Sequence, residues 1–261
     1  MNREETLQQF DRLLDIMNEL REKCPWDKDQ TWESIRHLSI EEIYELSDAI
    51  LSNDSIEVKK ELGDILLHIV FYSKIGSETE LFDMGEVIDE ICNKLIRRHP
   101  HIYGNVQAED AEQVKQNWEQ IKLKEKGEQR QSVLQGLPRS MPALVKAYRM
   151  QEKVAAVGFD WDTAGEAFAK VKEELREFEE AETAIDKIDE FGDLLFALIN
   201  YARKSGINPD DALEKTNMKF KGRFELIEKR AAESGLNLNE MTLAQMDEIW
   251  EEAKGIERGL K

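Results

Sequence analysis

The sequence predicts an all-α protein built from two similar helical units in tandem. Apolar residues recur with the helical period almost throughout, without sustained strand-like alternation and without an Asn-Gly or Asp-Gly hairpin turn. Hydrophobic residues make up 41% and charged residues 35% of the 261-residue chain, a balance typical of a soluble globular helical protein. The same motifs also occur twice in the same order, which predicts the tandem arrangement.

The helices follow from the position of each apolar stripe. The first stripe is formed by Leu7, Phe10, Leu13, Leu14 and Met17, and a proline in CPWDKDQ interrupts it. Further helices are expected at 33–51, 55–75, 82–98 and 109–126, and in the second half at 142–156, 164–183, 186–204, 209–233 and 242–254.

Paired motifs define the two units. WDKDQ and EEIYEL in the first half correspond to WDTAG and EELREF in the second, and NWEQIK at 117–122 corresponds to IWEEAK at 249–254. The intervening KGEQRQSVLQGLPRSMPAL is richer in Gly, Ser, Gln and Pro, which is typical of a connection. We therefore expect units at 1–126 and 142–261, joined by a linker at 127–141.

Charge and cysteine content limit the possible environments and partners. The net charge of −19 argues against direct nucleic-acid binding, which needs a basic face. Cys24 and Cys92 form no CxxC pair, so we expect a reducing cytoplasmic location without zinc or a redox centre. The charged start is unlike a signal peptide, and the longest apolar run is too short to span a membrane.

Each unit carries EExxE followed by ExxD, and this repeat predicts a metal site. The acids are Glu42, Glu45, Glu61 and Asp64 in the first unit, and Glu174, Glu177, Glu190 and Asp193 in the second. Spacing of three places each pair on one helix face, so antiparallel packing would bring four carboxylates together. Such a set is costly without a cation, and an all-oxygen set suits Mg²⁺ or Mn²⁺.

A solvated helix face is the alternative, because an isolated ExxE is common in a chain with 55 acidic residues. The repeat favours the metal site, since Gly63 and Gly192 recur before the Asp, and an apolar run follows each motif. In the second unit that run, 194–199, is apolar on every side and predicts a buried helix.

A di-iron site is a second metal alternative, and it needs Glu-x-x-His on its helices. The residues three before His37, His68, His99 and His101 are Ser34, Ile65, Ile96 and Arg98, so the motif is absent from the sequence. A histidine-free set favours magnesium and phosphate chemistry.

Basic and aromatic residues could bind a phosphorylated ligand. Lys219 and Arg223 lie four residues apart, as do Lys94 and Arg98, and each pair could bind phosphate oxygens or simply lie at the surface. Trp250 and the first-unit Trp118 could stack on a base or close the core. The sequence contains no glycine-rich phosphate loop.

These motifs, together with CPWD, RRHPHIYG, GLPRSMPAL and VGFDW, resemble the MazG family over essentially the whole chain. The resemblance implies two tandem four-helix units, with a fold related to the dimeric all-α dUTPases. It also implies Mg²⁺-dependent hydrolysis of nucleoside triphosphates between the α and β phosphates, giving the monophosphate and pyrophosphate. The implied role is house-cleaning or control of the nucleotide pool. The implied oligomeric state is a homodimer.

The resemblance also implies roles for individual residues. The two acidic sets would be magnesium ligands, and Glu173 could orient the attacking water. The implied nucleotide-binding residues are Lys170, Lys172, Lys219, Arg223 and Trp250 in the second unit, and Lys94, Arg98 and Trp118 in the first. Gly222 departs from the family, which tends to have Arg there, and this weakens one phosphate contact.

We expect the second unit to perform most of the catalysis. Pro100 should end the first unit's helix early and leave Arg98 at its terminus, whereas Arg223 lies inside a continuing helix. Two rival functions are a helical interaction module with vestigial sites and a regulatory sensor that binds nucleotides without turnover. Release of pyrophosphate would distinguish the enzyme from both.

Overall fold

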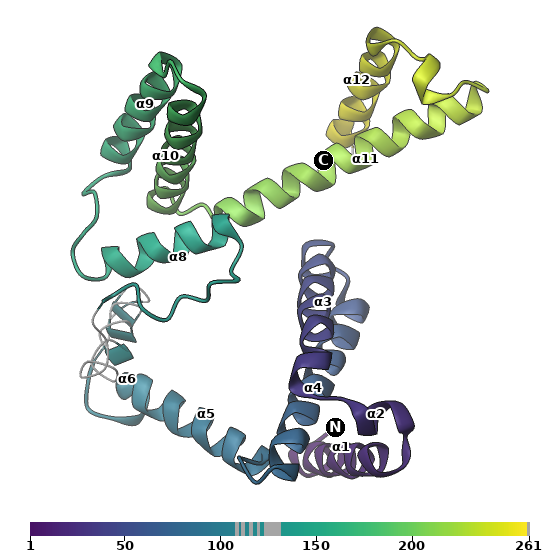
Figure 1. Ribbon diagram of the computed structural model, residues 1–261, viewed down its shortest axis with the longest axis vertical. Helices are drawn as coiled ribbons and strands as arrows, with labels where there is room; N and C mark the ends of the chain where they lie inside the picture. Colours follow the sequence, from purple (N-terminus) through teal and green to yellow (C-terminus); the bar gives the residue numbers. More distant parts are fainter. Residues whose placement is uncertain (108–109, 111–112, 115–116, 119–120, 123–131, 260–261) are drawn as a thin grey trace. The chain divides into compact units, whose positions relative to one another are not determined.

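The computed structural model describes residues 1–261 except 108–109, 111–112, 115–116, 119–120, 123–131 and 260–261 (Figure 1). Within the described residues the regular structure is helical and contains no strand, which confirms the predicted all-α class. None of the described helices is both long and apolar enough to be a membrane span. The chain divides into two compact units, Met1–Val114 and Lys115–Lys261.

The first unit contains helices α1 (Arg3–Lys23), α2 (Pro25–Asp29), α3 (Trp32–Leu51), α4 (Ser55–Glu78), α5 (Met84–Arg98) and α6 (Pro100–Tyr103). Side chains explain where these helices begin. The side chains of Asn2, Thr31 and Asp83 each accept a hydrogen bond from the backbone N–H of the residue three positions later. The side chain of that later residue accepts a hydrogen bond from the backbone N–H of the capping residue. Pro25 occupies the first turn of α2, where its missing N–H costs little.

The core of the first unit lies where α1 and α3 pack against α4. Met17 and Ile35 are almost fully buried there, together with Val70 and Phe71. Arg21 of α1 pairs with Glu78 at the end of α4, and it also donates to the carbonyls of Asp27, Lys28 and Gln30. The Arg21 guanidinium therefore connects α1 to α2 and to the end of α4.

The second unit contains α8 (Ala143–Ala155), α9 (Ala164–Glu180), α10 (Ala184–Lys204), α11 (Pro209–Glu233), the 3₁₀ turn η1 (Leu238–Glu240) and α12 (Leu243–Gly259). Helices α9 and α10 form a close hairpin, α8 packs on α10, and α11 pairs with α12 (Figure 1). Val171, Leu194 and Ala197 are buried between α9 and α10. Arg203 and Lys204 pair with Asp160, which fixes the VGFDW segment to the end of α10.

The apolar run at 194–199 is only partly buried, which corrects the expectation of burial on every side. Leu194, Ala197 and Ile199 are buried, whereas Leu195 and Phe196 are 45% and 43% exposed. One helix neighbour, α9, covers one side of α10, and α8 covers part of another. Leu195, Phe196 and Leu198 are therefore only partly covered by the described residues of this chain.

Most predicted helices agree with the structure to within a few residues. Part of the predicted helix at 109–126 lies outside the described residues, as do residues 127–131 of the predicted linker. The division into 1–126, 127–141 and 142–261 therefore stays a prediction.

Candidate metal and nucleotide site

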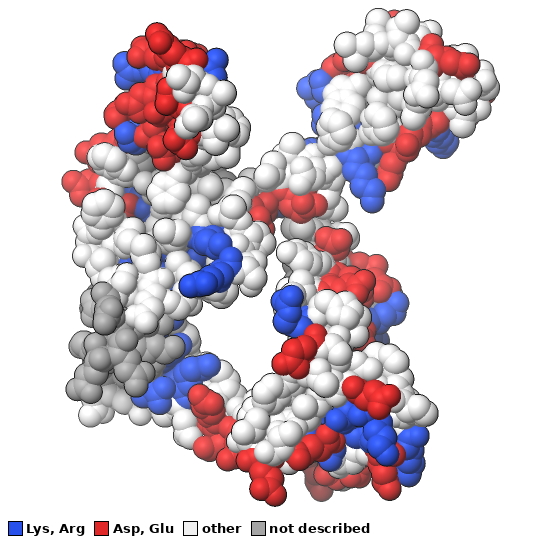
Figure 2. Space-filling model, viewed as in Figure 1, with Lys and Arg blue, Asp and Glu red and all other residues white. Residues whose placement is uncertain are grey.

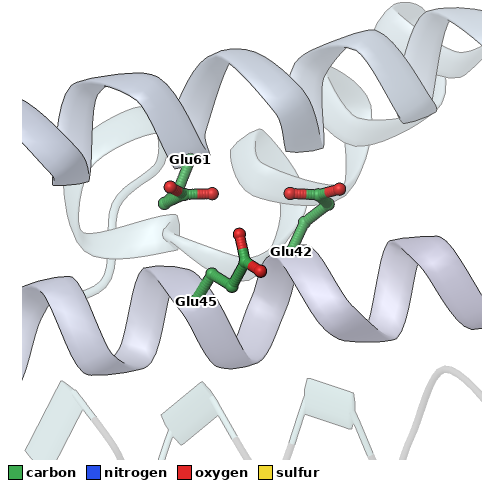
Figure 3. A group of neighbouring side chains, drawn as sticks. All are labelled: Glu42, Glu45 and Glu61. Atoms are coloured by element: carbon green, nitrogen blue, oxygen red, sulfur yellow. The ribbon is translucent and has the colours of Figure 1, made fainter.

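Three carboxylates of the first unit converge between α3 and α4. Glu42 and Glu45 project from α3 toward Glu61 of α4, and an oxygen from each lies within 4.8 Å of the others (Figure 3). The two helices are joined by the turn at 52–54, in which Asn53 has a φ of 55° that Asn tolerates better than most residues. The short turn makes the hairpin antiparallel, so the i, i+3 pair of α3 faces the start of α4.

Charge in this cluster is poorly balanced. Burial, together with the neighbouring Asp64 and Glu45, raises the pKa of Glu42. The pKa of Glu61 is raised by burial and by the same neighbours. Glu61 is 8% exposed, and its Oε2 has no hydrogen-bond partner among the described residues. A buried carboxylate oxygen without a donor fits a site that holds a cation.

The second unit repeats this arrangement on α9 and α10. Glu174 and Glu177 come from α9 and Glu190 from α10, again with one oxygen from each within 4.8 Å of the others. Burial and the adjacent Glu174 raise the pKa of Glu177. Figure 2 shows acidic side chains concentrated on the α9–α10 hairpin, which carries this cluster.

Lys170 distinguishes the second cluster from the first. Its Nζ lies 2.6 Å from Glu174 Oε1 and 2.7 Å from Glu173 Oε1. Hydrogen bonds to these two carboxylates raise the pKa of Lys170, which is therefore firmly protonated. In the first unit Leu38 occupies the corresponding position, four residues before Glu42, and no described Lys or Arg forms an ion pair with that cluster.

The two aspartates of the ExxD motifs lie outside these clusters of mutually close oxygens. Asp64 is close enough to raise the pKa values of Glu42 and Glu61, but it lies outside the set of mutually close oxygens. Asp193 is exposed on α10, also outside the corresponding set. Both remain predicted ligands, on the same helix as a clustered glutamate and one turn away from it.

The basic and aromatic residues of the second unit form a separate group on α11 and α12. Arg223 donates to Glu257 at 2.9 Å and 2.7 Å, and its guanidinium carbon lies 5.2 Å from the centre of the Trp250 ring. Phe220 packs edge-on against Trp250 at 5.1 Å between ring centres. Glu257 was not identified from the sequence, because it is far from Arg223 along the chain and belongs to no repeated motif.

The other predicted nucleotide-binding residues have different surroundings. Lys219 is exposed on α11, about one turn before Arg223, and Lys172 of α9 has its Nζ 4.8 Å from the Phe168 ring centre. In the first unit Lys94 and Arg98 are half-buried on α5. Trp118 is also half-buried, but it falls within Lys115–Lys261, the second of the two compact units. Among the described interactions, none joins Lys219, Arg223 or Trp250 to the second acidic cluster.

The helix-end prediction agrees with the structure. Arg98 is the last residue of α5, with Pro100 opening α6, whereas Arg223 lies in the middle of α11. Gly222 does not interrupt α11.

Comparisons with known protein families match both halves of the chain. Residues 30–103 match the MazG nucleotide pyrophosphohydrolase domain, and residues 149–220 match phosphoribosyl-ATP pyrophosphohydrolase. These ranges contain the two acidic clusters.

Full-length relatives extend the match. The chain is 42% identical over 257 residues to the nucleoside triphosphate pyrophosphohydrolase of Escherichia coli K12, covering 95% of this chain and 98% of that protein. It is 41% identical to the nucleoside triphosphate pyrophosphohydrolase/pyrophosphatase MazG of Thermotoga maritima, covering 94% and 96%. It is also 43% identical to YabN of Bacillus subtilis, covering 96% of this chain and 52% of that protein. On this full-length similarity, with its duplicated carboxylate clusters, the chain belongs to the MazG family of nucleotide pyrophosphohydrolases.

Proposed function

We propose that this protein hydrolyses nucleoside triphosphates between the α and β phosphates, releasing a monophosphate and pyrophosphate, in a house-cleaning or nucleotide-pool role. Full-length similarity to nucleoside triphosphate pyrophosphohydrolases supports the activity. The observation that carries the proposal is the carboxylate cluster, present twice and each time with one nearly buried glutamate, Glu61 or Glu174.

The clusters are suited to Mg²⁺, with Mn²⁺ as a substitute. The donors are all carboxylate oxygens, which these hard cations prefer. The buried Oε2 of Glu61 has no hydrogen-bond partner among the described residues, and a bound cation would neutralise its charge. In the second unit Glu174, Glu177, Glu190 and Asp193 would hold the ion. When bound, the ion would neutralise negative charge on the phosphates during cleavage.

The remaining residues bind and orient the substrate. Lys170 holds Glu173 beside Glu174, so Glu173 is well placed to accept a hydrogen bond from an attacking water. Lys219 and Arg223 are donors for phosphate oxygens, and Trp250 packs against the Arg223 guanidinium. Arg223 must exchange part of its pairing with Glu257 for a phosphate.

We assign the main activity to the second unit and a slower or more selective one to the first. A cation in the middle of a helix, such as Arg223, is held on both sides by helical backbone, whereas Arg98 ends its helix. Arg223 is further oriented by two hydrogen bonds to Glu257.

We also propose a homodimer. The acidic hairpins expose many large apolar side chains, and such surfaces mark association sites. These include Ile40, Ile43, Tyr44, Leu62, Leu66 and Ile69 in the first unit, and Leu175, Ile185, Ile188, Phe191, Leu195 and Leu198 in the second. Light scattering should give twice the monomer mass of 30.3 kDa, and a fully active monomer would contradict the proposal.

The decisive experiment measures pyrophosphate release from a panel of nucleoside triphosphates. We expect turnover with Mg²⁺, a lower rate with Mn²⁺, and none after treatment with EDTA. Binding of nucleotides without pyrophosphate release would favour the regulatory sensor, and absence of both would favour the interaction module.

A further inference from the structure

A histidine of the first unit lies one helical turn beyond the predicted ligand Asp64. His68 follows Asp64 by four residues and Glu61 by seven, so the three residues lie along one face of α4. Two ligands four residues apart on a helix can bind one metal ion together, as the two histidines of a helical zinc motif do. The Asp64–His68 pair differs from the Glu-x-x-His of di-iron proteins in both its acid and its spacing.

Electrostatic interactions place His68 near the acidic cluster. Burial and neighbouring charges, including that of Asp64, raise the pKa of Glu42 and of Glu61. Burial lowers the pKa of His68, and the charge of Asp64 opposes this shift. Asp64 is therefore close to the glutamates and to His68. Because its pKa is lowered, the imidazole of His68 is neutral at neutral pH and has an unprotonated nitrogen, as a metal ligand needs.

Two buried polar atoms on this face of α4 lack partners. The Nδ1 atom of His68 is buried and has no hydrogen-bond partner among the described residues, and the same holds for Oε2 of Glu61. Buried polar atoms are rarely left unpaired in proteins. A nitrogen and a carboxylate oxygen that are both unpaired, with Asp64 between their residues in the sequence, indicate a bound cation rather than a solvated helix face.

The second unit has no histidine that could take this role. The four histidines of the chain all lie within Met1–Val114: His37, His68, His99 and His101. The residue seven after Glu190 is Ala197, which belongs with Val171 of α9 to the buried cluster of the hairpin. This position faces the other helix of the hairpin, so the repeat indicates that His68 faces α3, the helix that carries Glu42 and Glu45.

We propose that His68 is an additional ligand of the metal site in the first unit, where its Nδ1 binds a divalent transition-metal ion that the carboxylates also hold. The inference rests on the metal sites of the proposed function and adds a nitrogen donor that the second unit lacks. Imidazole nitrogen favours transition-metal ions over Mg²⁺, which prefers oxygen ligands. The first site therefore selects a transition-metal ion, whereas the second site, with carboxylates alone, is the magnesium site.

The test measures coordination rather than turnover. Co²⁺ is added to the metal-free full-length protein, and proton NMR detects the paramagnetically shifted ring protons of a coordinated histidine. We expect these signals in the wild type and in His37→Ala, the control, because His37 is exposed on α3. We expect their loss in His68→Ala. His68→Gln keeps a polar side chain of similar size, so it keeps the test valid if His68→Ala fails to fold.

Metal affinity provides the second readout, measured by isothermal titration calorimetry. For both His68 variants we expect Co²⁺ to bind at least about tenfold more weakly and Mg²⁺ affinity to change less than about threefold, because only Co²⁺ uses the nitrogen. Histidine signals that persist in both variants, or that are absent from a wild type that binds Co²⁺, would overturn the inference even if the protein releases pyrophosphate. His68-dependent Co²⁺ binding without pyrophosphate release would instead retain this inference and reject the proposed hydrolysis.

Discussion

The two acidic clusters are each built from an i, i+3 pair of glutamates on one helix and a third glutamate on the next, but they balance charge differently. In the first, Glu61 has an unpartnered buried oxygen and no described ion pair. In the second, Lys170 contacts Glu174 directly. A duplicated motif therefore does not ensure a duplicated site, because a single position four residues away, Leu38 or Lys170, changes the electrostatics of the cluster.

The same contrast holds beyond the carboxylates. The second unit has Arg223 in the middle of α11 and in contact with Trp250, whereas the first unit ends α5 at Arg98. These differences support the proposed assignment of nucleotide binding mainly to the second unit.

The largest expected effect comes from matched removal of ligand charge. Glu190→Gln with Asp193→Asn should lower kcat on nucleoside triphosphates at least about 100-fold, about 2.7 kcal/mol of barrier. Glu61→Gln with Asp64→Asn should lower it only a few-fold. Pyrophosphate release by both variants on several substrates is the measurement, and the opposite order would reverse the assignment of the main site.

Removing the charge of a single predicted ligand, Asp193, should already lower turnover by the second unit. Asp193→Asn keeps the shape of the side chain, so the helical circular dichroism spectrum should not change. Turnover should fall more than about tenfold, about 1.4 kcal/mol. A smaller loss would show that Asp193, which lies outside the close carboxylate set, is not a metal ligand.

An ion pair in the first unit should make its stability pH-dependent. Hydrogen bonding by Arg21 holds the pKa of Glu78 below its ordinary value, so this pair stabilises the fold above about pH 4.3, the unperturbed value of Glu. The stabilisation is lost as the pH falls through the lowered pKa of the folded state. Glu78→Gln should therefore cost about 1–2 kcal/mol of unfolding free energy at neutral pH, and the deficit should disappear in acid. Urea unfolding of both proteins across that range measures it, and a deficit independent of pH would reject the ion-pair explanation.

Lys170 can be tested by comparing it with a nearby lysine. Lys170→Met leaves the buried Glu174 without its cation, so the metal-free protein should melt at a lower temperature and gain more from added Mg²⁺ than the wild type does. Lys172→Met is the control, because Lys172 contacts the Phe168 ring rather than the cluster. Equal shifts in the two variants would show that Lys170 does not balance the cluster.

Two helical glycines, one in each unit, should respond in opposite directions to replacement by alanine. A Cβ at Gly76 of α4 would lie 2.9 Å from the Phe82 ring and 2.9 Å from its carbonyl oxygen, so Gly76→Ala should destabilise the first unit by about 1–3 kcal/mol. At Gly222 of α11 nothing lies within 4 Å, so Gly222→Ala should stabilise the second unit by about 0.5–1 kcal/mol. Thermal unfolding of both variants tests the contrast, and a destabilising Gly222→Ala would indicate close packing at this position.

The sequence by itself determined the helices, their order and the acidic pairs. Helical periodicity and capping residues act over a few neighbouring positions, so the starts of α1, α3 and α5 follow from Asn2, Thr31 and Asp83. Residues three apart share a helix face whatever the tertiary structure, so the pairing of Glu42 with Glu45 could be predicted. The repeated ExxD motif likewise predicted that Glu61 and Glu190 would approach these pairs.

Only the tertiary structure decided which groups meet across helices. Contacts such as Arg223 with Glu257, or the Gln151 amide with the Phe196 carbonyl, depend on how helices far apart in the chain cross and rotate. Those angles are set by the packing of many apolar side chains at once, and no local spacing encodes them. For the same reason the sequence could not show which sides of the apolar run after Asp193 are covered. The run was expected to be buried on every side, and the described neighbours of α10 cover only part of it.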